Sequence, residues 1–291
     1  RVQLTDQDVE GSFTAQSHMT GFIDILAIPI TFAPVELTGG MDGGTPSASE
    51  WVGVDTAGSE TGLYLFNDTK DIRFLCAPGQ TDTTVQRALV DYCESHSTKG
   101  NCKAILDEPL ANDLVDEAVA FRNITMQRNT PFATLLYPWL YIDHPNVVNA
   151  TLQMPPSPFY MGLASKAANT VGIRQSPAGT THGKISSNVR GLTRNIGDTE
   201  HSLLEEAGIV PIRFENVYGY CFKSSRTMWS VYDGYQYWPT QAMYNYLAAT
   251  LENLGKLYEQ LPNSEDTRSQ LQTSVSSLMS ALHSNKEFYP E

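Results

Sequence analysis

Three short, almost uninterrupted apolar segments dominate the middle of the chain: residues 71–78 (DIRFLCAP), 102–109 (CKAILDEP) and 132–139 (FATLLYPW). Strands buried on both faces of a sheet carry such runs, whereas strands with one solvated face alternate apolar and polar residues. In the two intervening stretches, residues 85–93 and 114–124, apolar side chains recur at helical spacing. The alternation of strand and helix predicts right-handed crossovers and a parallel α/β sheet.

Polar residues at the expected helix starts support this pattern. Thr81 or Asp82 could cap the first helix, and Asn112 precedes the second. Near the end of the chain, Ser264 is the expected cap of a last helix, because Glu265 and Asp266 follow it in the first turn.

The remaining sequence predicts two further parts. Residues 1–68 alternate short apolar runs with glycine and proline, which indicates a small β-rich domain. Residues 69–222 form the α/β core domain and include a strand pair in the apolar run 209–223. Apolar stripes in residues 223–291 predict a helical hairpin, the start of a truncated C-terminal domain. The expected fold class is α/β, or mixed α+β.

Composition narrows the function classes. The chain has 291 residues, of which 41% are hydrophobic, as in a globular protein. Its net charge of -13 argues against direct binding of nucleic acid or of an anionic membrane, because both need basic surfaces. No segment reaches the roughly 18 apolar residues of a membrane span. The four cysteines lack a CxxC motif and are expected to be free and buried.

The candidate chemistry lies where the predicted strands end. Asp107, Glu108, Asp143 and His144 could chelate a divalent metal or act as an acid and a base, since ligands bind beyond the carboxyl ends of parallel strands. Alternatively, they end strands and cap the following helices, and a proline follows each pair. We favour the structural interpretation, and expect no catalytic, cofactor-binding or metal-binding residues and no cofactor.

The segment Tyr137-Pro138-Trp139 predicts a rigid joint. Pro138 cannot donate a hydrogen bond to a neighbouring strand, so the strand must bend or become an edge there. Trp139 offers a large apolar face that could clamp the bend against a helix over residues 156–169. Small residues on that helix would permit close approach of the backbone, namely Gly162, Ala164, Ala167 and Ala168.

The order of motifs between Gly62 and Leu282 resembles the contractile tail sheath proteins of bacteriophages, with their bacteriocin and secretion-system relatives. The similarity begins with a glycine-led strand and an Asp-Ile strand (GLYLFNDTKDIRFLCAPGQTD) and continues through AILDEP and LLYPWLYI. It extends through MPPSPFYMGLASKAANTVGIRQSPAG, LLEEAGIVPIRF and GYCFKSSRTM to LPNSEDTRSQLQTSVSSLMSAL. Val210 stands where the family has asparagine, and the family's later basic pair is missing.

The resemblance implies a virion structural protein that is not an enzyme. Copies of it would stack as hexameric rings around a tail tube protein and contract to drive the tube through the host envelope for genome ejection. Its location would be the virion tail, assembled in the host cytoplasm. Two alternatives stay open: an α/β enzyme with a strand-end acidic site, and another viral capsid or receptor-binding module.

Two expectations about assembly follow from the resemblance. The chain starts at Arg1 instead of methionine and stops at FYPE, so we expect a fragment that lacks the family's C-terminal arm and also its N-terminal arm. Such a fragment is expected to be a monomer that forms no tubes, whereas the full-length protein polymerises. Contraction is expected to rotate rigid bodies that meet near residues 68 and 223.

Overall fold

The structure is a computed structural model, and it describes residues 43–69, 72–95, 102–185 and 188–285. The chain divides into two compact units, residues 1–45 and residues 46–291. All the helices and strands described below belong to the second unit. The expected boundaries at residues 68/69 and 222/223 stay predictions.

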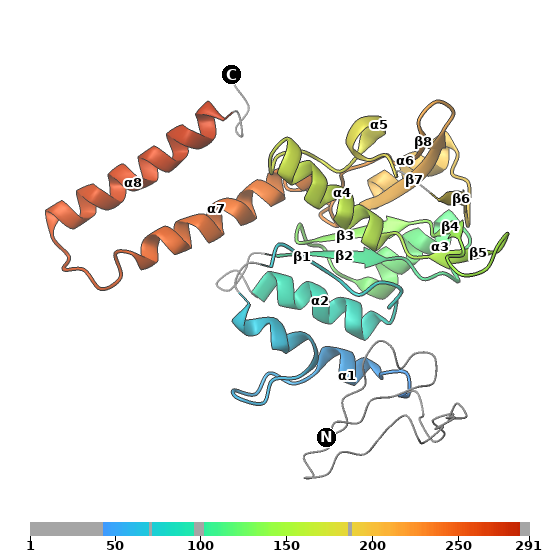
Figure 1. The fold of residues 1–291 in the computed structure, drawn as a ribbon, viewed down its shortest axis with the longest axis horizontal. Coiled ribbons are helices and arrows are strands. Elements are labelled where there is room, and N and C mark those ends of the chain that lie inside the picture. The colour runs from blue at the N-terminus through green and yellow to red at the C-terminus, as the bar shows by residue number, and fades with distance from the viewer. Residues whose placement is uncertain (1–42, 70–71, 96–101, 186–187, 286–291) are drawn as a thin grey trace, which may run out of the picture. The chain divides into compact units, whose positions relative to one another are not determined.

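A five-stranded sheet forms the centre of the second unit (Figure 1). Its strands, in spatial order, are β1 (Phe74–Cys76), β2 (Lys103–Asp107), β3 (Ala133–Tyr137), β7 (Ile209–Glu215) and β8 (Gly219–Phe222). The first four are parallel, and β8 pairs with β7 in the antiparallel direction. The predicted parallel α/β sheet and the predicted strand pair are therefore confirmed.

One face of this sheet packs against three helical segments. Two of them follow β1 and β2 along the chain, and the third precedes β7. These are α2 (Thr83–Ser95), α3 (Val115–Ala120) with its π-helical continuation η5 (Phe121–Met126), and α6 (Asp198–Glu206). Alternate strand residues such as Ala104, Leu106 and Leu135 point towards these helices and form a buried apolar cluster with them. Leu204 of α6 is also fully buried in this cluster.

The opposite face is covered by α4 (Ser157–Thr170), which lies across the sheet from α2 in Figure 1. Ile105 and Leu136 of the sheet meet Tyr160 of α4 and Trp238 in a second buried cluster. The rings of Tyr160 and Trp238 meet edge to face with their centroids 5.2 Å apart. Both faces of β2 and β3 are thus buried, as their continuous apolar runs predict.

Trp238 opens α7 (Trp238–Lys256), and α8 (Glu265–Ser284) returns alongside it to form the predicted hairpin (Figure 1). The side chain of Ser264 accepts a hydrogen bond from the Thr267 amide, so Ser264 is the N-cap as predicted. Within the described ranges, no helix is long and apolar enough to cross a membrane.

A small antiparallel sheet flanks the central one. It consists of β5 (Thr151–Met154), β4 (Leu140–Asp143) and β6 (Val189–Leu192), in that order. The short helix α5 (Gly179–His182) lies against β8.

The described part of the predicted N-terminal domain is helical. Residues 43–69 contain α1 (Ala48–Val52) and the 3-10 helix η3 (Gly62–Asp68) and, within that range, no strand. The prediction of a glycine-led strand at Gly62 is therefore wrong. Residues 1–42 lie outside the described residues, and their β-rich character stays a prediction.

Two local expectations are also wrong. Asn112 does not cap α3: its amide donates to the Glu108 carboxyl, and Glu117 instead accepts from the amide of Leu114 at the N-cap. Gly162 is not at a close contact, because the helical period turns it towards solvent while Ala164 and Ala167 face the sheet. Asp82, by contrast, accepts from the Thr84 amide and caps α2 as one of the two predicted candidates.

The neighbouring residues Leu203 and Leu204 test how much α6 contributes to the core. Leu204 is fully buried and Leu203 is 44% exposed. We expect Leu204→Ala to lower the free energy of unfolding by about 3 kcal/mol, through lost burial and a residual cavity. Leu203→Ala should lower it by about 0.5 kcal/mol or less. Urea unfolding followed by tryptophan fluorescence measures both, and equal losses would contradict this packing.

Candidate functional site

The carboxyl edge of the parallel sheet is where sequence reasoning places candidate chemistry. Asp107 ends β2 there, but its carboxylate is occupied by the fold. Oδ1 accepts from the Ser157 amide at 2.8 Å, and Oδ2 accepts from the Ser157 hydroxyl at 2.6 Å and the Gly79 amide at 3.2 Å. Asp107 therefore caps the first turn of α4. The prediction that Asp107 caps a helix is confirmed. The prediction that this helix is the one following β2 is wrong, since Asp107 caps α4.

Burial raises the pKa of both strand-end acids. It raises the pKa of Asp107 to about 6, although hydrogen bonds from Ser157 and Gly79 act in the opposite direction. Burial also raises the pKa of Glu108 well above its usual range. One oxygen of Glu108 accepts from the Asn112 amide at 2.8 Å. Burial that raises the pKa of a carboxyl group disfavours its charged form, which is the form that divalent cations prefer as a ligand.

Asp143 and His144 lie elsewhere, at the end of β4 in the small sheet. Asp143 forms an exposed ion pair with Arg190 at 2.6 Å, and His144 Nδ1 accepts from the Asn146 amide at 3.1 Å. The structure thus divides the four candidates between two sheets. Among the described residues, no group of three or more His, Cys, Asp and Glu side chains is arranged to hold a metal ion. The absence of metal binding and of catalysis stays a prediction.

The Tyr137-Pro138-Trp139 segment is a joint between the two sheets. β3 ends at Tyr137, the Tyr137–Pro138 peptide bond is cis, and the chain enters the small sheet at Leu140. The indole nitrogen of Trp139 donates to the Glu108 carbonyl oxygen at 2.7 Å, and its ring lies beside Gly79. The predicted break in the strand is confirmed, whereas the predicted clamp of Trp139 against α4 stays a prediction.

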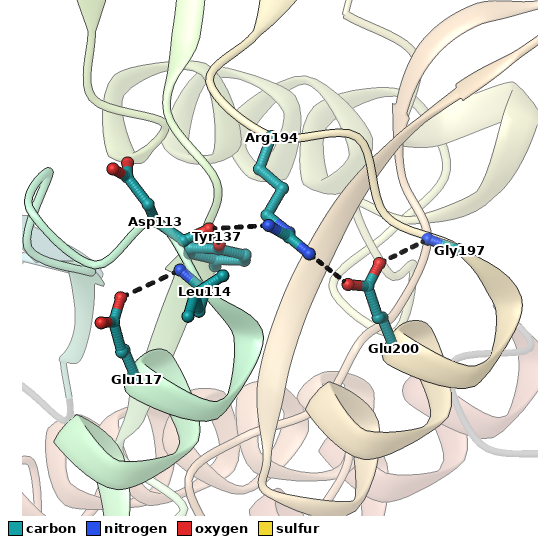
Figure 2. Close-up of polar contacts among 7 residues, drawn as sticks. All are labelled: Asp113, Leu114, Glu117, Tyr137, Arg194, Gly197 and Glu200. Carbon is teal, nitrogen blue, oxygen red and sulfur yellow. Dashed lines mark hydrogen bonds and ion pairs between the residues drawn. The ribbon is translucent and has the colours of Figure 1, made fainter.

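Figure 2 shows a polar cluster beside this joint that sequence reasoning missed. The Tyr137 hydroxyl and Arg194 both donate to the Asp113 carbonyl oxygen, each at 3.2 Å. Arg194 also pairs with Glu200 at 2.6 Å. The other Glu200 oxygen accepts from the Gly197 amide at 2.9 Å, at the start of α6.

The cluster links the beginnings of two helices. Glu117 accepts from the Leu114 amide at the start of α3, just as Glu200 accepts from the Gly197 amide at the start of α6. Arg194 bridges the two starts, and the Arg194 guanidinium with the Gly197 amide lowers the pKa of Glu200. A local signal existed for each half, since glutamate three residues after an N-cap is a helix-start pattern. The bridge itself joins residues 81 positions apart and has no local signal.

The polar side chains at this edge connect neighbouring elements of the fold through hydrogen bonds and an ion pair. Asp107, Trp139, Tyr137 and Arg194 direct polar atoms to backbone or side-chain groups of neighbouring elements. Burial raises the pKa of Tyr137 to about 12, so its hydroxyl stays protonated and donates. The arrangement fixes helices to strand ends.

The pH dependence of stability tests the buried state of Asp107. Its pKa is about 6 in the fold against 3.8 ordinarily, so the folded protein binds this proton more tightly than the unfolded chain does. The resulting stabilisation is complete below the unfolded pKa and is lost as the pH rises through the folded pKa. Relative to Asp107→Asn, we expect the free energy of unfolding of the unaltered protein to fall by about 2–3 kcal/mol between about pH 4 and about pH 7.

Chemical unfolding at a series of pH values measures this difference. Asp68→Asn removes one negative charge at an exposed position and is the matched control. A free-energy difference between Asp107→Asn and the unaltered protein that does not change across this pH range would contradict the buried, proton-binding Asp107.

Solved structures with this fold come from contractile injection systems. The contracted sheath complex of an extracellular contractile injection system, PVC, matches with a TM-score of 0.65 and 19% identity over 80% of this chain and 62% of that chain. The contracted helical sheath of the anti-feeding prophage, AFP, matches with a TM-score of 0.61 and 21% identity over 73% and 55%. A chain of the AFP baseplate matches with a TM-score of 0.59 and 20% identity over 74% and 54%.

These matches rest on structure, since no protein-family model and no curated protein matches the sequence. The chain spans 54% to 62% of the length of the three structures. At this level of identity, they show a shared fold. The chain is therefore similar in fold to contractile sheath proteins, which confirms the resemblance predicted from the order of its sequence motifs.

Proposed function

We propose that this protein is a structural subunit of a contractile sheath. Copies of the chain stack as rings around an inner tube, and collective contraction drives that tube forward. The observation that carries the proposal is the shared fold with the contracted PVC sheath, which extends over 80% of the chain at a TM-score of 0.65. The contracted AFP sheath supports it independently.

Exposed apolar side chains also favour assembly. Val217 in the β7–β8 turn is 83% exposed, Val148 in the β4–β5 turn is 89% exposed, and Leu257 at the end of α7 is 70% exposed. Single exposed apolar residues are ordinary, but here they occupy the tips of projecting turns and helices, where neighbouring copies could cover them. The net charge of -13 disfavours close approach of copies at low salt, so such contacts must outweigh long-range repulsion.

Several finer assignments belong to the same proposal. The first partner is another copy of the chain, in rings that are hexameric by the family resemblance. The second partner is the tube protein. The particle is a phage tail or a related extracellular injection device, and genome ejection applies only in the former case. The commitment of the strand-end side chains to the fold's own hydrogen bonds supports a structural role over the alternative of an enzyme with an acidic site.

We further propose that contraction moves parts of the subunit as rigid bodies. The core around β2 and β3 is packed on both faces, and packed cores are bistable instead of continuously deformable. The expected bodies are residues 1–68, 69–222 and 223–291.

Amide hydrogen exchange on extended and contracted particles tests this proposal. Protection within residues 72–95 and 102–170 should be the same in both states, because the sheet and its covering helices stay intact. Differences should be confined to surfaces and to the segments that join the three bodies. Loss of protection in β2 or β3 on contraction would show that the core refolds and would contradict rigid-body motion.

Self-assembly is the most direct property to test. The protein in its full natural length, purified and shown to be folded by circular dichroism, should form tubes or stacked rings in negative-stain electron microscopy. Sedimentation velocity should show large species whose amount rises with salt, because salt screens the repulsion between acidic copies. A folded full-length protein that stays monomeric at all salt and protein concentrations would contradict a sheath role.

A further inference from the structure

Two of the four cysteines lie against each other in the core. The sulfur atoms of Cys93 and Cys102 are 3.2 Å apart, and the two residues are 0% and 1% exposed. Both are free thiols in this structure. The other two cysteines have different neighbours: Cys76 contacts the sulfur of Met161, and Cys221 contacts the Gly219 carbonyl oxygen.

Rigid elements hold each sulfur in place. Cys93 is in the last turn of α2, on the helix face that packs against the sheet. Cys102 directly precedes β2, where the Lys103 amide donates to the Arg73 carbonyl oxygen at 3.0 Å. The Cys102 carbonyl oxygen accepts from Asn245 of α7 at 3.4 Å. The pair therefore lies where α2, β2 and the base of α7 meet.

The contact is close to the geometry of a covalent bond. A disulfide has a sulfur–sulfur distance of about 2.0 Å, so the two sulfurs need to approach by only about 1 Å. The buried position also keeps competing thiols away from both sulfurs, which favours a bond within the pair.

The electrostatics assign different roles to the two thiols. The two sulfurs share one S–H···S hydrogen bond. The contact with Cys93 lowers the pKa of Cys102, whereas burial raises the pKa of Cys93. The thiolate is the reactive form of cysteine. Cys102 is thus suited to attack an oxidant first, and Cys93 to complete the bond.

We propose that Cys93 and Cys102 form an intrachain disulfide in the folded protein when a hydroperoxide oxidises them. The Cys102 thiolate attacks one peroxide oxygen, the O–O bond breaks, and Cys102 becomes a sulfenic acid. The Cys93 sulfur then attacks the Cys102 sulfur, and the hydroxyl group leaves with a proton as water. With hydrogen peroxide, two thiols and one peroxide give one disulfide and two water molecules.

The bond would act as a redox-dependent brace. It ties the end of α2 to the start of β2 and closes a loop of about ten residues, which restricts the unfolded chain. Because Cys102 also contacts α7 through its carbonyl oxygen, the brace lies at the base of the helical hairpin. This inference does not depend on the proposed sheath function.

Peptide mapping after treatment with hydrogen peroxide tests the proposal on the unaltered protein. Trypsin cuts after Arg87, Lys99 and Lys103, so Cys93 and Cys102 fall in separate peptides, residues 88–99 and 100–103. Without reductant, these peptides should appear as one cross-linked species that is two hydrogen atoms lighter than their sum. Dithiothreitol should separate them again, and the oxidised protein should melt about 5 °C higher than the reduced one.

Variants distinguish this pair from nonspecific oxidation. Cys93→Ser and Cys102→Ser should each abolish the cross-linked species, whereas Cys221→Ser is the matched control and should leave it unchanged. The proposal is overturned if folded, unaltered protein yields only separate sulfinic or sulfonic peptides. It is also overturned if cross-links to Cys76 or Cys221 form as readily as the bond between Cys93 and Cys102.

Discussion

The structure depends on the burial of one parallel sheet on both of its faces. All residues of β2 and β3 are buried. The sheet therefore needs α2 and α3 to cover one face and α4 to cover the other. That requirement fixes the order of the elements, because right-handed crossovers must place the connecting helices over the faces. It also produces two separate cores, one with Leu135 and Leu204 and one with Leu136 and Tyr160.

The same requirement determines what happens at the carboxyl edge of the sheet. Polar groups that emerge there are close to covered faces, so each needs a partner within the protein. Asp107 satisfies the free amide at the start of α4, and Trp139 satisfies the Glu108 carbonyl oxygen. An edge that holds ligands in many α/β proteins is used here to attach helices.

Much of the fold could be predicted because its signals are local. The apolar runs around Ile105 and Leu135 identify buried strands, and Asp82 and Ser264 precede helices that they do cap. Gly208, which directly precedes β7, is another local signal: it has a φ of 76°, and a Cβ there would lie 2.7 Å from the Thr227 carbonyl oxygen, so the position favours glycine.

The errors arise where distant contacts decide the structure. Gly62 opens a 3-10 helix whose backbone lies against the Trp51 carbonyl oxygen, and residues 62–68 carry no periodicity that distinguishes it from a strand. Arg194 was missed because its partners, Asp113 and Glu200, come from two different helix starts. Asp107 caps a helix that begins 50 residues later, which no rule of local spacing could assign.

The central claim is that this fold serves as a repeating unit of a contractile sheath. A helical reconstruction by electron cryo-microscopy of particles assembled from the full-length protein tests it most directly. The account predicts a wall of identical subunits around a tube, with residues 46–285 fitting the density of each subunit and the five-stranded sheet intact. Particles whose repeating wall cannot accommodate this sheet, or whose wall is built by another protein, would contradict it.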